Sequence, residues 1–212
     1  MPTMVDHEEL IQHLADGATA VSRPLPVAPR ALVWAAIALA AGFGASRLMP
    51  TAVLDWSASG APLFLANAGL SLLVGFAALA SAFASSIPGR PNRGLMWVLA
   101  GCGLWLAINI AAIGLSANPW GHLTDGRYCF RFVALAGAPM IAVTLLALRR
   151  TRSLQPRRTL VLAGAAIGFL TFGLLAFCHP PAMTVVDFAM HIAAAAVLGL
   201  VTIVAGRRLV AA

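Results

Sequence analysis

The chain contains few charged residues for its length, and it contains no lysine. Of its 212 residues only 10% are charged, while 60% belong to the hydrophobic set. An ordinary soluble domain carries roughly 25% charged residues. A chain this apolar cannot cover itself with polar surface in water, so the composition excludes a conventional soluble globular protein and predicts a membrane protein.

All 14 basic residues are arginine, and they give a net charge of +7 and a pI of about 11.2. Such a charge is also typical of nucleic-acid-binding proteins. Here, however, the arginines flank apolar stretches and do not form an amphipathic basic face. We therefore expect no direct nucleic-acid binding and interpret the arginines as a signal of membrane topology.

Motifs of the common soluble enzymes are also missing. The sequence has no Walker A loop, no GxGxxG after a strand and no GxSxG elbow. Its three cysteines do not form the framework of a small secreted fold. The first 30 residues hold four acidic residues and no continuous apolar segment, so we expect no cleavable signal peptide. We do not expect an enzyme.

Six stretches are long and apolar enough to be transmembrane helices, each of which needs about 20 residues. We therefore predict an all-α membrane protein, a six-helix transmembrane bundle with a short amphipathic helix before it. Residues 1–30 would form the N-terminal helix and its tether, and residues 31–212 the transmembrane domain. The predicted spans are 31–48, 62–84, 94–115, 129–148, 159–177 and 185–205.

The arginines predict the orientation of these spans. With the N-terminus inside, 11 arginines face the cytoplasm and 3 face outward. This excess has the sign of the positive-inside rule. We therefore expect a multi-pass protein of the bacterial inner membrane, in contact with lipid, with both termini in the cytoplasm. The outward set is Arg47, Arg127 and Arg131.

The N-terminal segment shows helical periodicity. Leu10, Ile11 and Leu14 recur at helical spacing and form a narrow apolar stripe. The acidic flanks Glu8, Glu9 and Asp16 differ from the basic face of a helix that lies on lipid. The segment therefore looks suited to docking on a partner protein with basic surroundings. The alternative is a cap that packs on its own bundle.

Polar residues are sparse inside the spans. Asn67 and Asn109 are two of them, and Gly164 and Gly168 have the small-xxx-small spacing that allows close helix packing. Asp187 and His191, four residues apart, share a helix face near the start of the sixth span, and we interpret them as an interfacial polar cluster.

Two cysteines fall at the outer ends of their spans. Cys129 opens the fourth span and Cys178 closes the fifth, and a short inner loop joins these spans. The compartment outside the bacterial inner membrane permits disulfides, so a disulfide is possible here if the two Cα atoms lie within roughly 7 Å. His179 would lie at the same level, so a thiol and imidazole metal contact is a second possibility. The third possibility is that each cysteine only fills apolar space, which fits Cys102 best.

The order of several short motifs resembles the negative regulator of sigma F family, bacterial membrane-bound anti-sigma factors with six spans. The motifs are the D-x-x-E-L-I-x-x-L-A-D run from Asp6 to Asp16, the Arg23-Pro24 tether and the Arg127-Tyr128-Cys129 segment with Pro139 and Leu148-Arg149-Arg150 after it. Gly164, Gly168, Cys178 and Phe188 continue the series. The chain departs from the family around Cys178, because Phe177 stands where the family tends to have His.

The resemblance implies that the N-terminal segment binds an extracytoplasmic-function sigma factor and keeps it from RNA polymerase. Glu8, Glu9, Leu10, Ile11, Leu14 and Asp16 would form the binding surface. It also implies that Cys129 and Cys178 sense metal or oxidant stress. His179 is a further candidate because of its position next to Cys178, and not through the resemblance. We expect no resident cofactor other than a heavy-metal ion at these cysteines.

Two other functions are open from the residues alone. A small transporter or channel would need polar residues along a path through the bilayer, and the spans offer little beyond Asn67, Asn109 and scattered Ser and Thr. A membrane enzyme with thiol chemistry, similar to a quinone-coupled oxidoreductase, would ordinarily need a closely spaced cysteine pair, which the chain lacks.

Overall fold

Helices make up most of the described part of the chain. The computed structural model describes residues 7–18, 26–49, 60–87, 89, 94–151, 153–177 and 183–210, with only the backbone of Asp125. These residues form seven α-helices and one short 3-10 segment, and none of them forms a β-strand. The predicted all-α fold class is confirmed.

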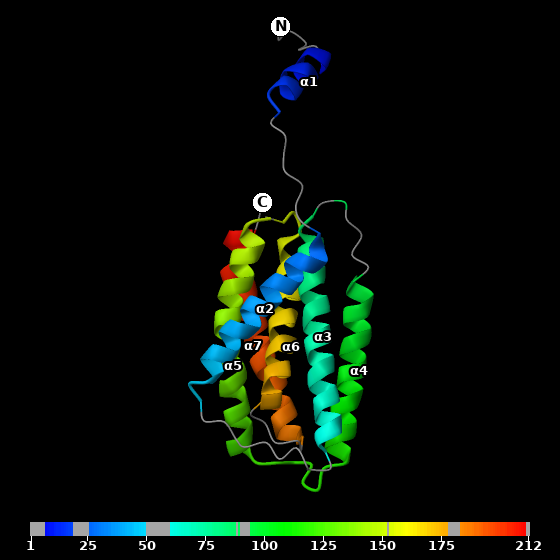
Figure 1. The fold of residues 1–212 in the computed structure, drawn as a ribbon, viewed down its shortest axis with the longest axis vertical. Helices are drawn as coiled ribbons and strands as arrows, with labels where there is room; N and C mark the ends of the chain where they lie inside the picture. Colours follow the sequence, from blue (N-terminus) through cyan, green and yellow to red (C-terminus); the bar gives the residue numbers. More distant parts are fainter. Residues whose placement is uncertain are drawn as a thin grey trace.

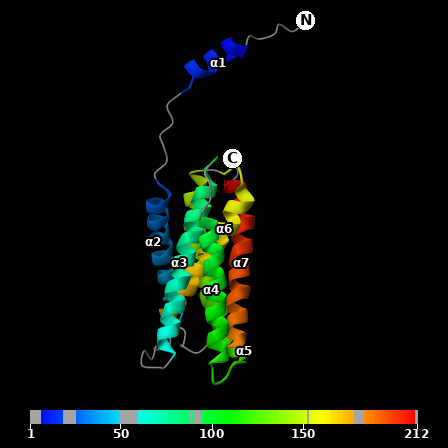
Figure 2. The same ribbon diagram turned by 90° about the vertical axis from the view of Figure 1, so that its right-hand side faces the viewer.

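Six of the helices run alternately up and down as one bundle (Figures 1 and 2). Each has the length and the apolar composition needed to cross a membrane. Backbone groups in a bilayer must be hydrogen-bonded internally, and continuous helices meet this requirement. The six are α2 (Val27–Ser46), α3 (Ala61–Ser85), α4 (Gly94–Gly114), α5 (Leu123–Arg149), α6 (Pro156–Leu174) and α7 (Val185–Val210).

The helix α6 forms the centre of the bundle, and α4 lies at its edge. The α6 helix packs against α3 and α7 along its length, while α5 packs against α2 and α7. By contrast, α4 packs mainly along α3. The buried share of the most apolar window is 72% in α6 and 17% in α4. Most of the α4 surface is therefore left uncovered by the other described helices.

Small residues allow the central helices to approach closely, as the sequence predicted. A Cβ on Gly164 would lie 2.8 Å from the Cα atom of Gly199, and one on Gly168 would lie 3.1 Å from the Cβ of Ala195. The crossing of α6 and α7 is therefore too close for larger side chains at these positions. The prediction of close packing at this pair of glycines is confirmed.

This crossing makes Gly164 sensitive to the smallest substitution. We expect Gly164→Ala to destabilise the bundle by about 1–3 kcal/mol, because the new methyl group meets backbone that must shift. Gly103→Ala is the matched control, since a Cβ there meets nothing within 4 Å. Thermal unfolding of the two variants in detergent measures the difference, and equal midpoints would contradict the packing described here.

Several helix boundaries differ from the predicted spans. The α5 helix begins at Leu123, six residues before the predicted start at 129, and α7 continues to Val210 instead of ending at 205. Beyond the end of α6, Leu175–Phe177 form the 3-10 segment η1. Hydropathy misses the added ends of α5 and α7 because they carry polar residues. In α7, Arg207 and Arg208 occupy the last turn, where cations interact favourably with the helix dipole.

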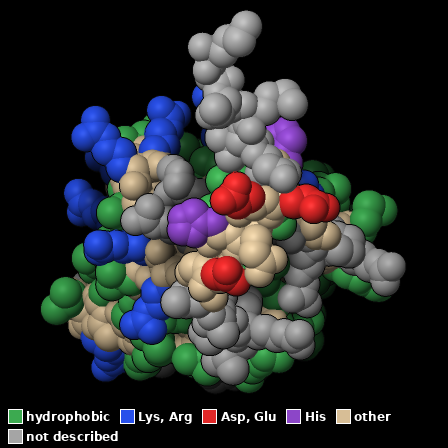
Figure 3. Space-filling view, turned by 90° about the horizontal axis from the view of Figure 1, so that it is seen from above, with side chains coloured by type: hydrophobic (Ala, Val, Ile, Leu, Met, Phe, Trp, Pro, Cys, Tyr) green, Lys and Arg blue, Asp and Glu red, His purple; other side chains and the backbone are tan. Residues whose placement is uncertain are grey.

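The two ends of the bundle differ in charge. We call one the arginine-rich end: α2, α4 and α6 begin there, and α3, α5 and α7 end there. Figure 3 looks onto it and shows basic side chains gathered along one side. Its described arginines are Arg30, Arg149, Arg150, Arg157, Arg158, Arg207 and Arg208. The other end, which we call the opposite rim, carries Arg47, Arg127 and Arg131.

Candidate functional site

The N-terminal helix α1 (His7–Asp16) stands apart from the bundle, beyond the arginine-rich end (Figures 1 and 2). Glu8 and Glu9 lie in its first turn, where they complement the positive end of the helix dipole. At the other end, the N–H of Gly17 donates to the carbonyl of His13, and the helix stops. The helix predicted here is confirmed.

No residue of α1 is buried, and its apolar stripe is open to solvent. The exposed fraction is 44% for Leu10, 65% for Ile11 and 66% for Leu14. The structure therefore does not support the alternative in which this helix caps its own bundle. A ten-residue helix is marginal by itself in water, so an uncovered apolar stripe on it favours a docking function.

A polar cluster at the opposite rim joins α5 to the start of α7. Cys129, in the second turn of α5, is only 3% exposed, and its Sγ atom lies 3.8 Å from Oδ1 of Asp187. The hydroxyl of Thr184 donates to Oδ2 of Asp187 at 2.7 Å, and the Asp187 N–H donates back to Thr184 Oγ1 at 3.1 Å. The second of these bonds caps the N-terminus of α7, with the Thr184 hydroxyl oxygen accepting from a first-turn N–H.

The loop before α5 holds this cluster in place. The N–H of Val185 donates to the carbonyl of Pro119 at 2.7 Å, and that of Val186 donates to the carbonyl of Trp120 at 3.3 Å. Gly121 has a φ of +73°, and a Cβ at this position would collide with Thr184. Only glycine combines this conformation with so close an approach. The first turn of α7 is therefore fixed against the connection that leads into α5.

Asp187 and His191 are more buried than an interfacial cluster would be. They are 5% and 3% exposed, and the ring of His191 lies 5.7 Å from that of Phe172. Our interpretation of them as an interfacial cluster was therefore wrong about their surroundings. Their spacing of four residues indicated a shared face, but only the packing of α7 against α5 and α6 shows that this face is turned inward.

The described residues place two potential metal donors together at the opposite rim, the thiol of Cys129 and the carboxylate of Asp187. Among these residues there is no group of three or more His, Cys, Asp or Glu side chains placed to hold a metal ion. A tetrahedral ion would need further ligands from elsewhere. The other predicted residues, Cys178 and His179, lie outside the described part of the chain.

The two asparagines of the spans pair with each other. Asn67 of α3 donates to Oδ1 of Asn109 in α4 at 3.1 Å, and Asn109 donates back to Oδ1 of Asn67 at 3.2 Å. Nδ2 of Asn109 also donates to the carbonyl of Trp105 at 2.7 Å. This pair joins the peripheral helix α4 to the rest of the bundle.

Six helices that are long and apolar enough to cross a membrane, preceded by an exposed amphipathic helix, define a polytopic membrane protein. Residues 14–211 match the family described as "Negative regulator of sigma F". The match covers nearly the whole chain, so the chain belongs to this family and is a negative regulator of a sigma factor. No curated protein and no solved structure matched the chain.

The family match covers only some of the predicted site residues. Leu14, Asp16, Cys129 and Cys178 fall within residues 14–211, whereas the first four residues of the predicted docking surface precede it. Those four are Glu8, Glu9, Leu10 and Ile11. The case for these residues therefore rests on α1 itself, with its helical geometry and its exposed stripe.

Proposed function

We propose that this protein is a membrane-anchored anti-sigma factor that sequesters an extracytoplasmic-function sigma factor and releases it on a stress signal. The observation that carries this proposal is the exposed apolar stripe of α1, formed by Leu10, Ile11 and Leu14. Membership of a family of sigma-factor regulators supplies the class of partner for this stripe. Residues 1–30 would be the binding segment and residues 31–212 the anchor.

Binding would combine apolar burial with charge complementarity. The three apolar side chains would enter a groove on the sigma factor, and Glu8, Glu9 and Asp16 would meet its basic surface. Such a surface otherwise faces DNA phosphates or the polymerase. The acidic residues would raise the encounter rate and the specificity more than the affinity. Occupying this surface would keep the sigma factor inactive at the membrane.

The signal would act on the cysteines of the opposite rim. Oxidation would join Cys129 and Cys178, with two protons released and two electrons passed to the oxidant; a heavy-metal ion would instead bind their thiolates, with His179 as a further ligand. Cys129 is buried at the contact of α5 with α7, so either event would change how these helices pack. Release of the sigma factor requires that the two arrangements of α5 and α7, before and after the signal, differ in their affinity for the signal.

Co-purification tests the proposed partnership. The tagged full-length chain, solubilised from bacterial membranes, should retain a small extracytoplasmic-function sigma factor through size-exclusion chromatography. A housekeeping sigma factor expressed in the same way serves as the control. Equal recovery of both, or of neither, would refute a dedicated anti-sigma function.

The arginine asymmetry supports a bacterial inner-membrane location with both termini in the cytoplasm. We expect a fluorescent protein fused after Val210 to fluoresce, and an alkaline phosphatase fused there to be inactive, because phosphatase needs the oxidising outer compartment. A phosphatase fused at Ser116, in the turn after α4, should be active. The reverse pattern would show that the opposite rim faces inward.

A further inference from the structure

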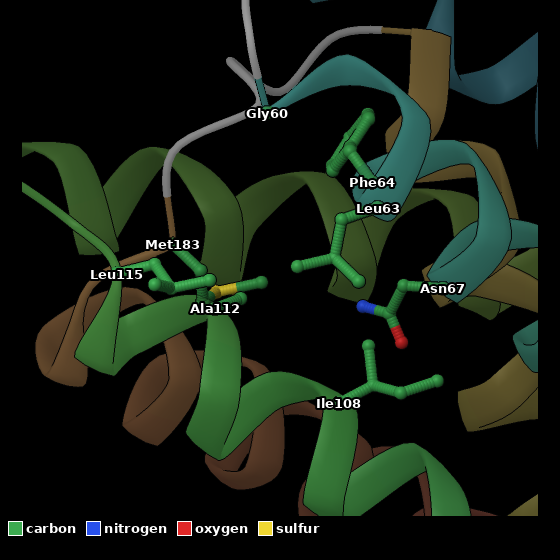
Figure 4. A pocket seen from close by; sticks show the side chains of 8 residues that line it. All are labelled: Gly60, Leu63, Phe64, Asn67, Ile108, Ala112, Leu115 and Met183. Carbon is green, nitrogen blue, oxygen red and sulfur yellow. The ribbon is translucent and has the colours of Figure 1, made fainter.

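A cavity opens between α3 and α4 near the opposite rim. Its volume is about 280 Å³, and Gly60 and Leu115 mark the ends of the two helices beside it. Figure 4 shows Leu63 and Ile108 on facing sides of the space, with Met183 and Ala112 together on another side. The walls are apolar except at Asn67. Ligand sites commonly combine such walls with a few directed polar groups.

A smaller space lies next to this cavity. It measures about 20 Å³, shares Phe64, Asn67 and Met183 with the larger cavity, and reaches Trp105 and His191. This volume is about that needed for one water molecule or one polar ligand atom. The shared residues form the partition between the two spaces, so a ligand in the larger cavity lies beside the buried polar side chains of the smaller one.

Two hydrogen-bond donors next to these spaces lack a partner among the described residues. Trp105 is 5% exposed, and its Nε1–H is buried without an acceptor. Asn67 uses one of the two hydrogens on Nδ2 for Asn109, so the other remains available, and Figure 4 shows this nitrogen directed into the cavity. A buried donor left without an acceptor costs about 1–3 kcal/mol, so a bound acceptor would be stabilising.

We propose that this cavity binds a small, uncharged, largely apolar molecule that carries an oxygen acceptor, such as a ketone, an ester or a quinone. The available N–H groups of Trp105 and Asn67 favour a ligand with a hydrogen-bond acceptor, and the apolar walls favour a ligand whose remaining surface is apolar. No Arg, Asp or Glu side chain occurs among the described residues that line either space, so an ionic ligand would lose its hydration without a permanent counter-charge. Because α4 packs mainly on α3, such a ligand would bridge the peripheral helix to the bundle.

A fluorinated acetophenone tests this site, with fluorinated ethylbenzene as the matched probe that lacks the oxygen. Fluorine NMR of the full-length protein in detergent should show saturable binding of the ketone. We expect Trp105→Phe to weaken ketone binding about three- to tenfold, the worth of one hydrogen bond, and to leave ethylbenzene binding unchanged. Phenylalanine retains the ring that stacks on Phe172.

Variants in which a larger side chain fills the cavity distinguish binding at this site from simple partition of the probe into the detergent micelle. Ala112→Phe should abolish saturable binding of both probes, and Ile108→Phe provides a second filled variant if the first is misfolded. Leu104→Phe is the control, because Leu104 is 54% exposed and lines neither space. The proposal fails if the filled variants bind the ketone like the native chain, or if Trp105→Phe leaves ketone affinity unchanged.

Discussion

Replacing Leu10, Ile11 and Leu14 together by Asp should lower the affinity for the sigma factor more than a hundredfold. Each side chain is about half to two-thirds exposed in the free protein. Burying this exposed apolar surface on docking would contribute roughly 1 kcal/mol of binding free energy per residue. Three such losses sum to about 3 kcal/mol, which is about two orders of magnitude in Kd. Titration of the labelled sigma factor against the protein in nanodiscs measures the change.

Single substitutions on the two faces of α1 provide the matched control. Ile11→Asp and Gln12→Asp each add one acidic residue to the same helix, but Gln12 lies on the face away from the stripe. We expect at least a fivefold loss of affinity for the first and less than a twofold change for the second. Equal effects would assign the loss to charge or helix stability, and an unaffected triple variant would remove α1 from the binding surface.

Replacing Cys129 by Ser should bring stress-induced release of the sigma factor down to the uninduced level. Serine keeps the size of the side chain, but its hydroxyl forms no disulfide and is a poor ligand for soft metals. The same loss is expected for Cys178→Ser. A reporter gene under a promoter that depends on the sigma factor, induced with cadmium or with a thiol oxidant, measures the response.

Cys102→Ser is the control for this experiment. Cys102 lies in the middle of α4, well away from the Cys129 and Asp187 cluster along the sequence and in a different helix. We expect this variant to respond like the native chain. Full induction in the Cys129→Ser chain would refute a sensor at the rim, and loss of response in all three variants would indicate a general effect of cysteine removal.

Much of the fold follows from local sequence. Long apolar runs between short polar segments determine the number and the order of the spans, because a bilayer solvates no other kind of segment. The periodicity of Leu10, Ile11 and Leu14 likewise determines where α1 forms and which face is apolar. Helix ends are less predictable, as the early start of α5 at Leu123 shows, since polar first turns extend a helix beyond its apolar part.

The candidate sites depend on which helices are neighbours, and hydropathy does not contain this information. Cys129 and Asp187 are 58 positions apart, and Asn67 and Asn109 are 42 apart. Close contacts at Gly164 and Gly168 bring α6 against α7, and this arrangement turns Asp187 and His191 inward. From the sequence, both residues could be assigned to a shared helix face but not to a buried cluster.

The arrangement places the two proposed functional elements at different ends of one bundle. The α1 helix lies beyond the arginine-rich end (Figure 1), and Cys129, in the second turn of α5, lies at the opposite rim. The helices α5 and α7 run the full length between these ends and pack against each other. A change at the rim would therefore reach the arginine-rich end through continuous helices, which is the physical basis for signalling across the membrane in this account.

The central claim, that α1 holds a sigma factor at the membrane, is tested most directly by cell fractionation. The sigma factor should sediment with membranes in cells that express the full chain, and it should move to the soluble fraction when residues 1–18 are deleted. An epitope tag on the bundle would show that both chains reach the membrane in equal amounts. A sigma factor that stays with the membranes without α1, or one that is soluble beside the full chain, would contradict the account.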